Sequence, residues 1–361
     1  MSSGAQEPIR FFLPGPVYVL EATRQAMTRP IVAHRSAEFQ ATWRRIAELL
    51  PPVFRTTRDA TVATASSTAL MEAALVSLTG RDVLHLTCGA FSERWLAIGR
   101  ALGRASDELA APWGEPNAPD LLRAALRRKR YEAVTLVHNE TSTGVVNPVG
   151  ELARVIREES DALVLVDAVS SLAGDRVETD AWGLDFVFAG VQKGFAAPPG
   201  LAALTLSERG EARARAIAHR GFYLDLVRYL DKHREGGPIT TPAVSICWAL
   251  EHQLERIAAE GLEARWARHH ALAATTEAWA ERLGLRYASA KGFRSRTVAC
   301  IASPPGVEAP RIVRAAAARG FTIGGGYGKW KPTTFRIGHM GEVRPPDLDA
   351  LLAVLEEEIR R

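Results

Sequence analysis

The chain contains 361 residues, which at roughly 150 residues per domain predicts two domains and a core large enough to be stable on its own. Hydrophobic residues make up 47% of the sequence and charged residues 24%, and these values exclude an intrinsically disordered chain. The net charge is +4 and the basic residues are scattered, without interleaved aromatic residues, so nucleic-acid binding is not expected.

Neither the cysteines nor the apolar segments point to secretion or to a membrane. The three cysteines, Cys88, Cys247 and Cys300, are odd in number and far apart, which argues against a disulfide framework and indicates a reducing compartment. The amino terminus shows no basic segment followed by an apolar run, and the longest apolar stretches fall far short of the roughly 20 residues of a membrane helix. We therefore expect a soluble, cytoplasmic protein with no membrane partner.

Short β-prone runs alternate with amphipathic segments over most of the chain. This alternation predicts an α/β fold in which helices cover both faces of a large, doubly wound, mostly parallel sheet. The apolar run Leu163-Val-Leu-Val166 is typical of a strand buried on both faces. The predicted strands span residues 61–64, 83–86, 133–137, 163–166, 186–188 and 202–206, and the predicted helices begin near residues 67, 92, 120, 150 and 244.

The pattern of predicted helices and strands changes at about residue 255 and indicates a smaller C-terminal α+β domain. A long helical pattern rich in Ala, Glu and Arg leads into a strand at 296–301, a helix at 309–319, a strand at 334–337 and a helix at 346–359. We place the N-terminal segment at 1–20, the large domain at 21–258 and the small domain at 259–361, with a helix running across the second boundary.

Lysine is rare in this sequence, and one lysine stands apart from the others. Only six of the 45 basic residues are lysines. Lys193 alone lies in a segment rich in glycine and apolar residues, with no other charge between residues 187 and 200. A lysine amine can lose its proton and form a Schiff base, whereas a guanidinium group stays protonated. Lys193 is therefore a candidate nucleophile.

Polar residues also follow other predicted strands, at the sheet edge where ligands bind in open α/β folds. The segment Ser66-Ser-Thr68 opens a helix whose free N–H groups suit a phosphate, although such residues are also ordinary helix caps. Asp167 ends a buried strand, where a carboxylate needs a cation or hydrogen-bond donors, or again caps a helix. The segment 138–144 adds more polar residues and is equally consistent with a simple turn.

Together these residues match the needs of pyridoxal 5'-phosphate better than any of them does alone. This cofactor requires a lysine for its aldehyde, an acid for its pyridine nitrogen, an anion site for its phosphate and a flat surface against its ring. Phe91 can supply the surface, although a place in the core is its simpler explanation. No metal-ligand spacing, P-loop or Gly-x-Ser-x-Gly elbow occurs, so no metal site is expected.

Several motifs then carry a resemblance to a known family. The most specific are Glu140-Thr-Ser-Thr-Gly144, Val166-Asp-Ala-Val-Ser-Ser171 and Gln192-Lys193 followed by Pro198-Pro-Gly200. They lie in order between Phe12-Leu-Pro-Gly-Pro-Val17 and Thr334-Phe-Arg-Ile-Gly-His-Met-Gly341. The sequence resembles the class V aminotransferases of pyridoxal phosphate fold-type I, in the alanine/serine:glyoxylate aminotransferase branch, with some features of phosphoserine aminotransferases. The resemblance covers nearly the whole chain.

The resemblance implies a role for each matching residue. Lys193 would hold the cofactor as an internal aldimine and, once displaced by substrate, move a proton between the substrate Cα and the cofactor. Asp167 would pair with the pyridinium nitrogen, and Arg336 would bind the substrate carboxylate as a two-pronged pair. The other implied contacts are to the cofactor from Ser66, Ser67, Thr68, Phe91, Thr141, Val169 and Gln192, to its phosphate from Thr240 of the partner subunit in a homodimer, and to the substrate from Gly15 and Arg35.

The chain departs from the family pattern at a few positions. Ser67 stands where relatives usually have glycine, which puts the close approach of the backbone to the phosphate in doubt. Gly236 and Gly237 stand where some relatives place a tyrosine that reaches the neighbouring subunit's phosphate, so we expect that contact to be absent. Phe91 replaces a tryptophan that is common in the animal enzymes.

The resemblance implies a small amino donor, alanine or serine, and a 2-oxo acid acceptor such as glyoxylate or pyruvate. A phosphoserine or aspartate aminotransferase using 2-oxoglutarate is the alternative, because segments 222–226 and 324–331 resemble phosphoserine-type relatives. Lys329, Lys331 or Arg35 could then bind a second acidic group, although the two lysines equally fit a solvated loop. Desulfurase or lyase chemistry is disfavoured, since no cysteine lies on a predicted mobile loop, and a non-catalytic interaction protein on this fold would form no lysine-bound cofactor.

Overall fold

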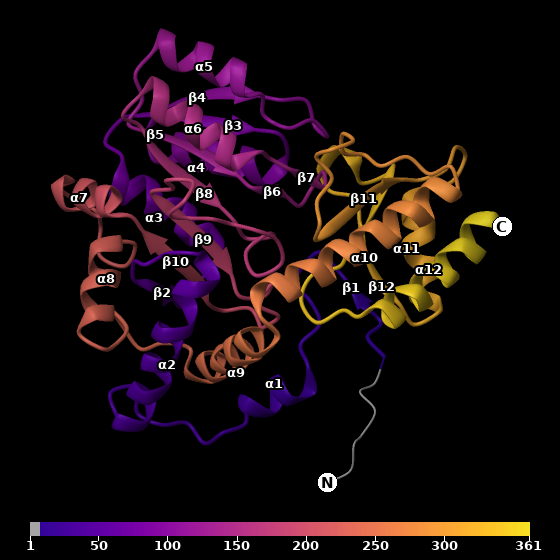
Figure 1. The fold of residues 1–361 in the computed structure, drawn as a ribbon, viewed down its shortest axis with the longest axis horizontal. Helices are drawn as coiled ribbons and strands as arrows, with labels where there is room; N and C mark the ends of the chain where they lie inside the picture. Colours follow the sequence, from indigo (N-terminus) through magenta and orange to yellow (C-terminus); the bar gives the residue numbers. More distant parts are fainter. Residues whose placement is uncertain (1–7) are drawn as a thin grey trace.

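The computed structural model describes residues 8–361 and contains one large and one smaller sheet (Figure 1). The first seven residues of the predicted N-terminal segment lie outside the described residues. The strands of the large sheet occur in the order β2 (Ala60–Ala63), β10 (Ala202–Leu206), β9 (Phe186–Gly190), β8 (Leu163–Asp167), β5 (Ala133–Val137), β3 (Asp82–Thr87) and β4 (Ala105–Ala110). Neighbours from β9 to β4 are parallel, and β10 is antiparallel to both β9 and β2. The predicted mostly parallel sheet is confirmed.

Helices cover this sheet on both faces because alternate side chains of each strand point to opposite sides. On β3 and β9, Val83 and Phe186 enter one core, whereas Leu84 and Val187 enter the other. The first core is closed by α3 (Ser67–Leu78), α4 (Ala90–Ala101), α7 (Glu208–Ala216) and α8 (Leu226–Arg234). The second core is closed by α2 (Ala37–Phe54), α5 (Pro119–Arg128), α6 (Val149–Glu159) and α9 (Val244–Glu260).

The smaller sheet combines the two ends of the chain. Its order is β1 (Phe11–Phe12), β12 (Thr322–Gly325), β13 (Thr334–Gly338) and β11 (Val298–Ala302), and it packs with α10 (Leu262–Arg282), α11 (Ala309–Ala318) and α12 (Pro345–Arg360). β1 pairs in parallel with β12, so part of the N-terminal segment completes the sheet of the C-terminal region. The sequence did not reveal this pairing, since a two-residue strand has no period to detect.

The chain passes from the large sheet to the smaller one through two consecutive helices. A helix does cross residue 258, as expected: α9 continues to Glu260. Gly261 then adopts a φ of +81°, a conformation that favours glycine, and α10 begins at Leu262. The predicted boundaries at residues 20 and 258 stay predictions, and the chain changes direction at Gly261. The remaining elements are α1 (Glu21–Ala26), the hairpin β6 (Asn139–Glu140) and β7 (Val145–Val146), and the short helix η1 (Gly328–Trp330).

Candidate active site

The predicted site residues collect at the carboxyl edge of the large sheet. Asp167 is the last residue of β8, and Lys193 follows the end of β9 by three residues. Because β5, β8 and β9 are parallel, the segments that follow them emerge at one edge. A cavity of about 220 Å³ lies there, lined by Ser66, Ser67, Thr68, Met71, Phe91, Arg94, Val137, Asn139, Thr141, Asp167, Val169, Gln192 and Lys193. Every predicted cofactor contact except Thr240 lies in this lining.

Asp167 is a buried carboxylate without a cationic partner among residues 8–361. Its side chain accepts one hydrogen bond, from the backbone N–H of Val169 at 2.8 Å, and the residue is 4% exposed. Burial raises the pKa of Asp167 to about 7. A buried carboxyl group with so few donors is costly to keep, so this position suits a ligand that brings its own N–H.

Lys193 is the second buried ionisable group of the cavity. Its Nζ donates to the carbonyl oxygen of Pro14, and the residue is 8% exposed. Burial, together with the nearby charge of Arg336, lowers the pKa of Lys193 to about 8. Gly15 lies directly against this side chain with a φ of +126°, and a Cβ atom at Gly15 would collide with the lysine. Gly15, predicted as a substrate contact, therefore leaves space for the amine.

The start of α3 forms the polar end of the cavity. Ser66 precedes the helix without making a side-chain capping bond, and the first turn contains no acidic residue. The Oγ of Ser67 is buried and has no hydrogen-bond partner in the described structure. The guanidinium group of Arg94 donates to Thr68 Oγ1 at 3.4 Å. A helix N-terminus, a hydroxyl without a partner and an arginine together suit an anion such as a phosphate.

Phe91 forms a wall of the cavity because a buried carboxylate fixes the start of α4. Glu140 accepts hydrogen bonds from the backbone N–H groups of Phe91, at 3.1 Å, and Ser92, at 3.0 Å. The guanidinium carbon of Arg94 lies 4.8 Å from the centre of the Phe91 ring, and the ring of Tyr327 lies 5.4 Å from it. The sequence motif contained Glu140, but its part in holding Phe91 was not foreseen.

Arg336, on β13 of the smaller sheet, does not line the cavity but lies beside it, because it bonds to Thr141 of the lining. Its Nε donates to the carbonyl oxygen of Gly325 at 2.8 Å and its Nη1 to that of Thr141 at 3.0 Å. No partner for Nη2 is found within the described residues. Two of its nitrogens are thus held by backbone, and a further donor is left for a carboxylate.

Some predicted residues do not line this cavity. Arg35 is exposed just before α2, and Lys329 and Lys331 are exposed, with Lys329 Nζ 4.6 Å from the ring centre of Trp113. Thr240 lies in the segment between α8 and α9. Conversely, sequence reasoning missed Arg94 and Asn139, although Arg94 stands three residues after Phe91, on the same side of a helix.

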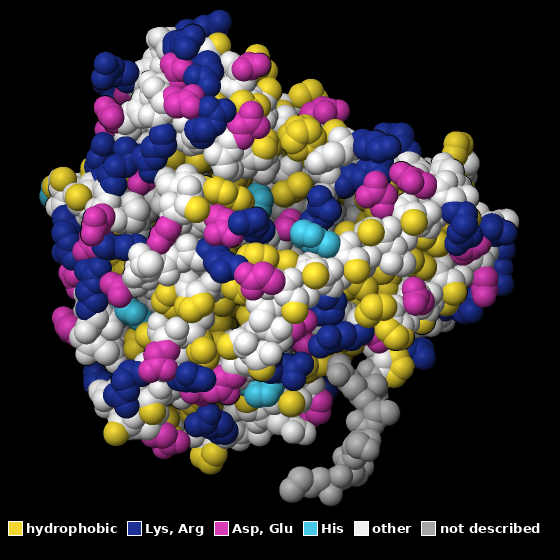
Figure 2. All heavy atoms as spheres, viewed as in Figure 1, with side chains coloured by type: hydrophobic (Ala, Val, Ile, Leu, Met, Phe, Trp, Pro, Cys, Tyr) yellow, Lys and Arg dark blue, Asp and Glu magenta, His cyan; other side chains and the backbone are white. Residues whose placement is uncertain are grey.

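Other features of the described structure do not combine unpaired reactive groups in a cavity. A larger hollow of about 640 Å³ lies between α2 and α9, but its charged residues already have partners, as in the ion pair of Arg55 with Glu263. On the face in Figure 2, basic and acidic side chains are interspersed. Among residues 8–361, no group of three or more His, Cys, Asp and Glu side chains could hold a metal ion. Across the same range, no helix combines the length and apolar composition needed to cross a bilayer.

Fold and site together define an α/β protein whose pocket combines a buried lysine, a buried acid and the N-terminus of a helix. Residues 22–344 match the family model of the class V aminotransferases, and the chain belongs to that family. The family predicted from the sequence motifs is confirmed, and with it the fold class and the assignment as a transaminase.

The chain is similar to proteins named as aminotransferases and to one named as a hydrogenase subunit. It is 35% identical to the soluble hydrogenase small subunit of Synechococcus sp., over 97% of this chain and 93% of that one. It is 32% identical to the L-aspartate–glyoxylate aminotransferase of Paracoccus denitrificans, over 94% of this chain and 87% of that one. The crystal structure of alanine–glyoxylate aminotransferase from Nostoc sp. matches with a TM-score of 0.91 at 30% identity, covering 100% of this chain and 97% of that one.

Proposed function

We propose that the protein is a pyridoxal 5'-phosphate-dependent aminotransferase that moves an amino group from a small amino acid, such as alanine or serine, to glyoxylate or pyruvate. One observation carries the proposal: Lys193 and Asp167 are both buried, line the same cavity and form no ion pair with each other. A buried lysine beside a buried acid would be expected to pair if the two had only a structural role. Their separation fits a ligand that lies between them.

The residues of the cavity fit this cofactor. Asp167 offers its carboxyl group to a pyridine N–H, and Lys193 offers an amine to the aldehyde. The Oγ of Ser67, buried without a partner, and the guanidinium group of Arg94 are available to the phosphate, and Phe91 to the ring. When bound, the cofactor supplies a sink for the electrons that remain on the substrate Cα when its proton departs.

The protein side chains then perform the proton transfer and the binding. With a pKa of about 8, the amine of Lys193 is neutral in a useful fraction of molecules near neutral pH, so it can accept the proton of the substrate Cα. The carbonyl of Pro14 orients this amine. Arg336 binds the substrate carboxylate with the donors that Gly325 and Thr141 leave free.

Similarity to named relatives supports glyoxylate as the acceptor. Both aminotransferases described above carry glyoxylate in their names. A dicarboxylic or phosphorylated donor with 2-oxoglutarate is the second candidate, and the similarity to the L-aspartate–glyoxylate aminotransferase favours an acidic donor. Lys329, Lys331 and Arg35 do not line the single-chain cavity and give it no support.

We also propose a homodimer in the cytoplasm. Thr240 does not line the cavity of its own chain, and in the dimer it would complete the phosphate site of the second copy. The three cysteines are free and buried, as suits a reducing compartment. Size-exclusion chromatography is expected to show a dimer, and a catalytically competent monomer would contradict it.

The decisive experiment reconstitutes the purified protein with pyridoxal 5'-phosphate and tests a matrix of substrates. The donors are alanine, serine, glycine, aspartate and phosphoserine, and the acceptors are glyoxylate, pyruvate and 2-oxoglutarate. We expect a visible absorbance band from the lysine-bound cofactor and the highest kcat/KM for alanine or serine with glyoxylate or pyruvate. A preference for aspartate or phosphoserine would select the second candidate, and absence of transfer with every pair would refute both.

A further inference from the structure

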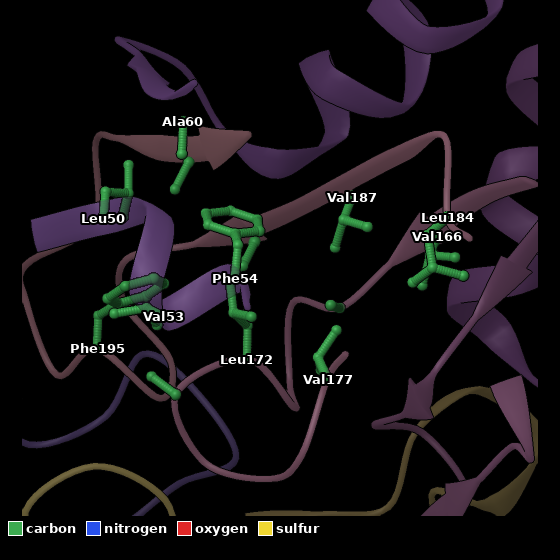
Figure 3. Close-up of a cluster of buried hydrophobic side chains, with 14 of the residues drawn as sticks. Leu50, Val53, Phe54, Ala60, Val166, Leu172, Val177, Leu184, Val187 and Phe195 are labelled. Carbon is green, nitrogen blue, oxygen red and sulfur yellow. The ribbon is translucent and has the colours of Figure 1, made fainter. Parts of the chain in front are cut away.

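The two segments that carry the ionisable pair of the site are packed tightly against each other. Segment 168–175 follows Asp167, and segment 191–201 contains Lys193. Leu172 and Phe195, one from each segment, lie in the same buried cluster (Figure 3). A Cβ atom on Gly194 would collide with the carbonyl oxygen of Leu172. The backbones of the two segments are therefore in direct contact.

These segments also adopt conformations that side chains rarely take. Ala173 has a φ of +62° and Ala196 a φ of +57°, both in the left-handed region. Such residues persist only where the surrounding structure holds them in place. The two segments therefore depend on contacts with the surrounding structure.

Arg265 of α10 bonds to both segments. It is fully buried, and its Nε donates to the carbonyl oxygen of Ala173 at 3.1 Å while its Nη2 donates to that of Gly194 at 2.8 Å. Gly194 directly follows Lys193. The Nη1 of Arg265 pairs with Glu260 at 2.8 Å and with Glu342 at 3.1 Å, so the buried charge of the guanidinium group is balanced. Because a guanidinium group is rigid and planar, it sets the spacing of the two carbonyl groups.

We propose that Arg265 is a positioning residue that holds Lys193 in register with Asp167 across the cavity. The inference rests on the proposed function, in which Lys193 binds the cofactor and Asp167 contacts its ring. One side chain bonds to both segments, so its loss lets the lysine shift relative to the acid while both groups remain present. A shift of this kind affects proton transfer more than substrate binding, since Arg336 is held separately by Gly325 and Thr141.

Arg268 provides a matched control on the same helix. It is almost as buried, at 9% side-chain exposure, and it shares Glu260 as a partner. Its other hydrogen bonds go to the carbonyl oxygens of Gly341 and Val343 and not to either segment of the site. The substitutions R265M and R268M therefore remove the same charge from one cluster, and only the first removes the bonds to segments 168–175 and 191–201.

The test compares holoenzymes of the wild type, R265M, R265K and R268M. Each is titrated with pH while the absorbance band of the lysine-bound cofactor is followed, and kcat, KM and thermal unfolding are measured. For R265M we expect the pH midpoint of the absorbance titration to shift by about half a pH unit or more. We also expect its kcat to fall about tenfold to a hundredfold, with the KM for the amino donor changed less than about threefold. R268M should lower the unfolding temperature yet keep the wild-type midpoint and kcat.

Two results would overturn the proposal: an R265M titration identical to that of the wild type, or an equal shift in R268M. If R265M does not fold, R265K decides, because lysine keeps the charge but replaces the planar fork of Nε and Nη2 with a single nitrogen, so the pH midpoint of its absorbance titration should also shift. An unchanged R265K midpoint contradicts the proposal. If the wild type itself forms no absorbance band with pyridoxal 5'-phosphate, the proposed function fails rather than the role of Arg265.

Discussion

Two buried aspartates at opposite ends of the same sheet have opposite surroundings. Asp185 precedes β9, is 1% exposed and is fully engaged: it pairs with Arg157 at 2.8 Å and Arg209 at 2.9 Å, and it accepts from Ser207 Oγ and the backbone of Val164. Asp167 ends β8 and accepts a single backbone hydrogen bond. Asp185, whose carboxylate has all its hydrogen-bond partners, joins segments of the fold. Asp167, whose carboxylate accepts one hydrogen bond, is available to a ligand.

The same contrast holds for two serines at helix starts. Ser207 Oγ accepts from the backbone N–H of Gly210 at 3.0 Å and so caps α7. Ser67 Oγ, at the start of α3, is buried and has no partner in the described structure. Asp185 and Ser207 at the amino edge of the sheet are paired within the protein, whereas Asp167 and Ser67 at the carboxyl edge keep bonding capacity for a ligand.

The largest expected effect comes from the lysine of the carboxyl edge. K193A should abolish the absorbance band of the bound cofactor and lower kcat by about 10⁴-fold or more, because no other amine lines the cavity. Spectrophotometry and steady-state kinetics measure both effects. K291A, which removes an exposed lysine, serves as the control and should behave as the wild type. If the K193A protein keeps the absorbance band, the assignment of Lys193 as the cofactor-binding lysine is wrong.

D167N should reduce kcat about a hundredfold to a thousandfold, because an amide cannot hold a positive charge on the ring nitrogen. The same substitution should stabilise the cofactor-free protein at alkaline pH. The folded-state pKa of Asp167 is raised to about 7, so its contribution to stability is complete below about pH 4 and is lost as the pH rises through 7. The charges of Lys193, Glu140 and Arg94 that act on this carboxyl are retained in D167N.

Denaturation of the cofactor-free proteins by urea at several pH values measures this difference. The free energy of unfolding of D167N should exceed that of the wild type by an amount that grows between pH 4 and 7, to roughly 4 kcal/mol at 1.36 kcal/mol per pKa unit. Above pH 7 the difference should stay constant. A D167N protein less stable than the wild type at pH 8 would show that Asp167 is a structural residue like Asp185.

D185N provides the opposite result at the amino edge. It leaves Arg157 and Arg209 without their shared carboxylate and should lower the free energy of unfolding by about 3 kcal/mol. At a temperature where the variant is folded, kcat and the cofactor band should equal those of the wild type. Thermal unfolding and kinetics on one preparation check both parts. A large loss of kcat in a folded D185N protein would remove the distinction between the two aspartates.

The smallest effect concerns the two serines. S67A should weaken cofactor binding about fivefold, equivalent to about 1 kcal/mol, and should leave the stability of the cofactor-free protein unchanged. S207A should lower that stability by about 1 kcal/mol, as does the loss of other helix caps, with unchanged cofactor affinity. Fluorescence titration with pyridoxal 5'-phosphate and urea denaturation separate the two results. Equal behaviour of the two variants would contradict the assigned difference.

The sequence by itself determined the sheet type, most strand positions and most of the residues that line the cavity. These features depend on local patterns, because an apolar run of four to six residues marks a buried strand and a polar residue directly after it marks the binding edge. For this reason Asp167, Lys193 and segment 66–68 could be found without a structure. Strands β4 and β12 were not predicted, since their runs mix charged residues or glycines with apolar ones.

Only the tertiary structure decided which distant groups meet. Arg265 reaches the carbonyl group beside Lys193 across 71 residues of chain, Glu140 holds the start of α4 from 48 residues away, and β1 pairs with a strand near the other end of the chain. No local pattern encodes such contacts, because each arises from the packing of whole elements and not from the spacing of neighbours. The difference between Asp167 and Asp185 likewise lies in what surrounds each carboxylate, and the folded chain alone supplies those surroundings.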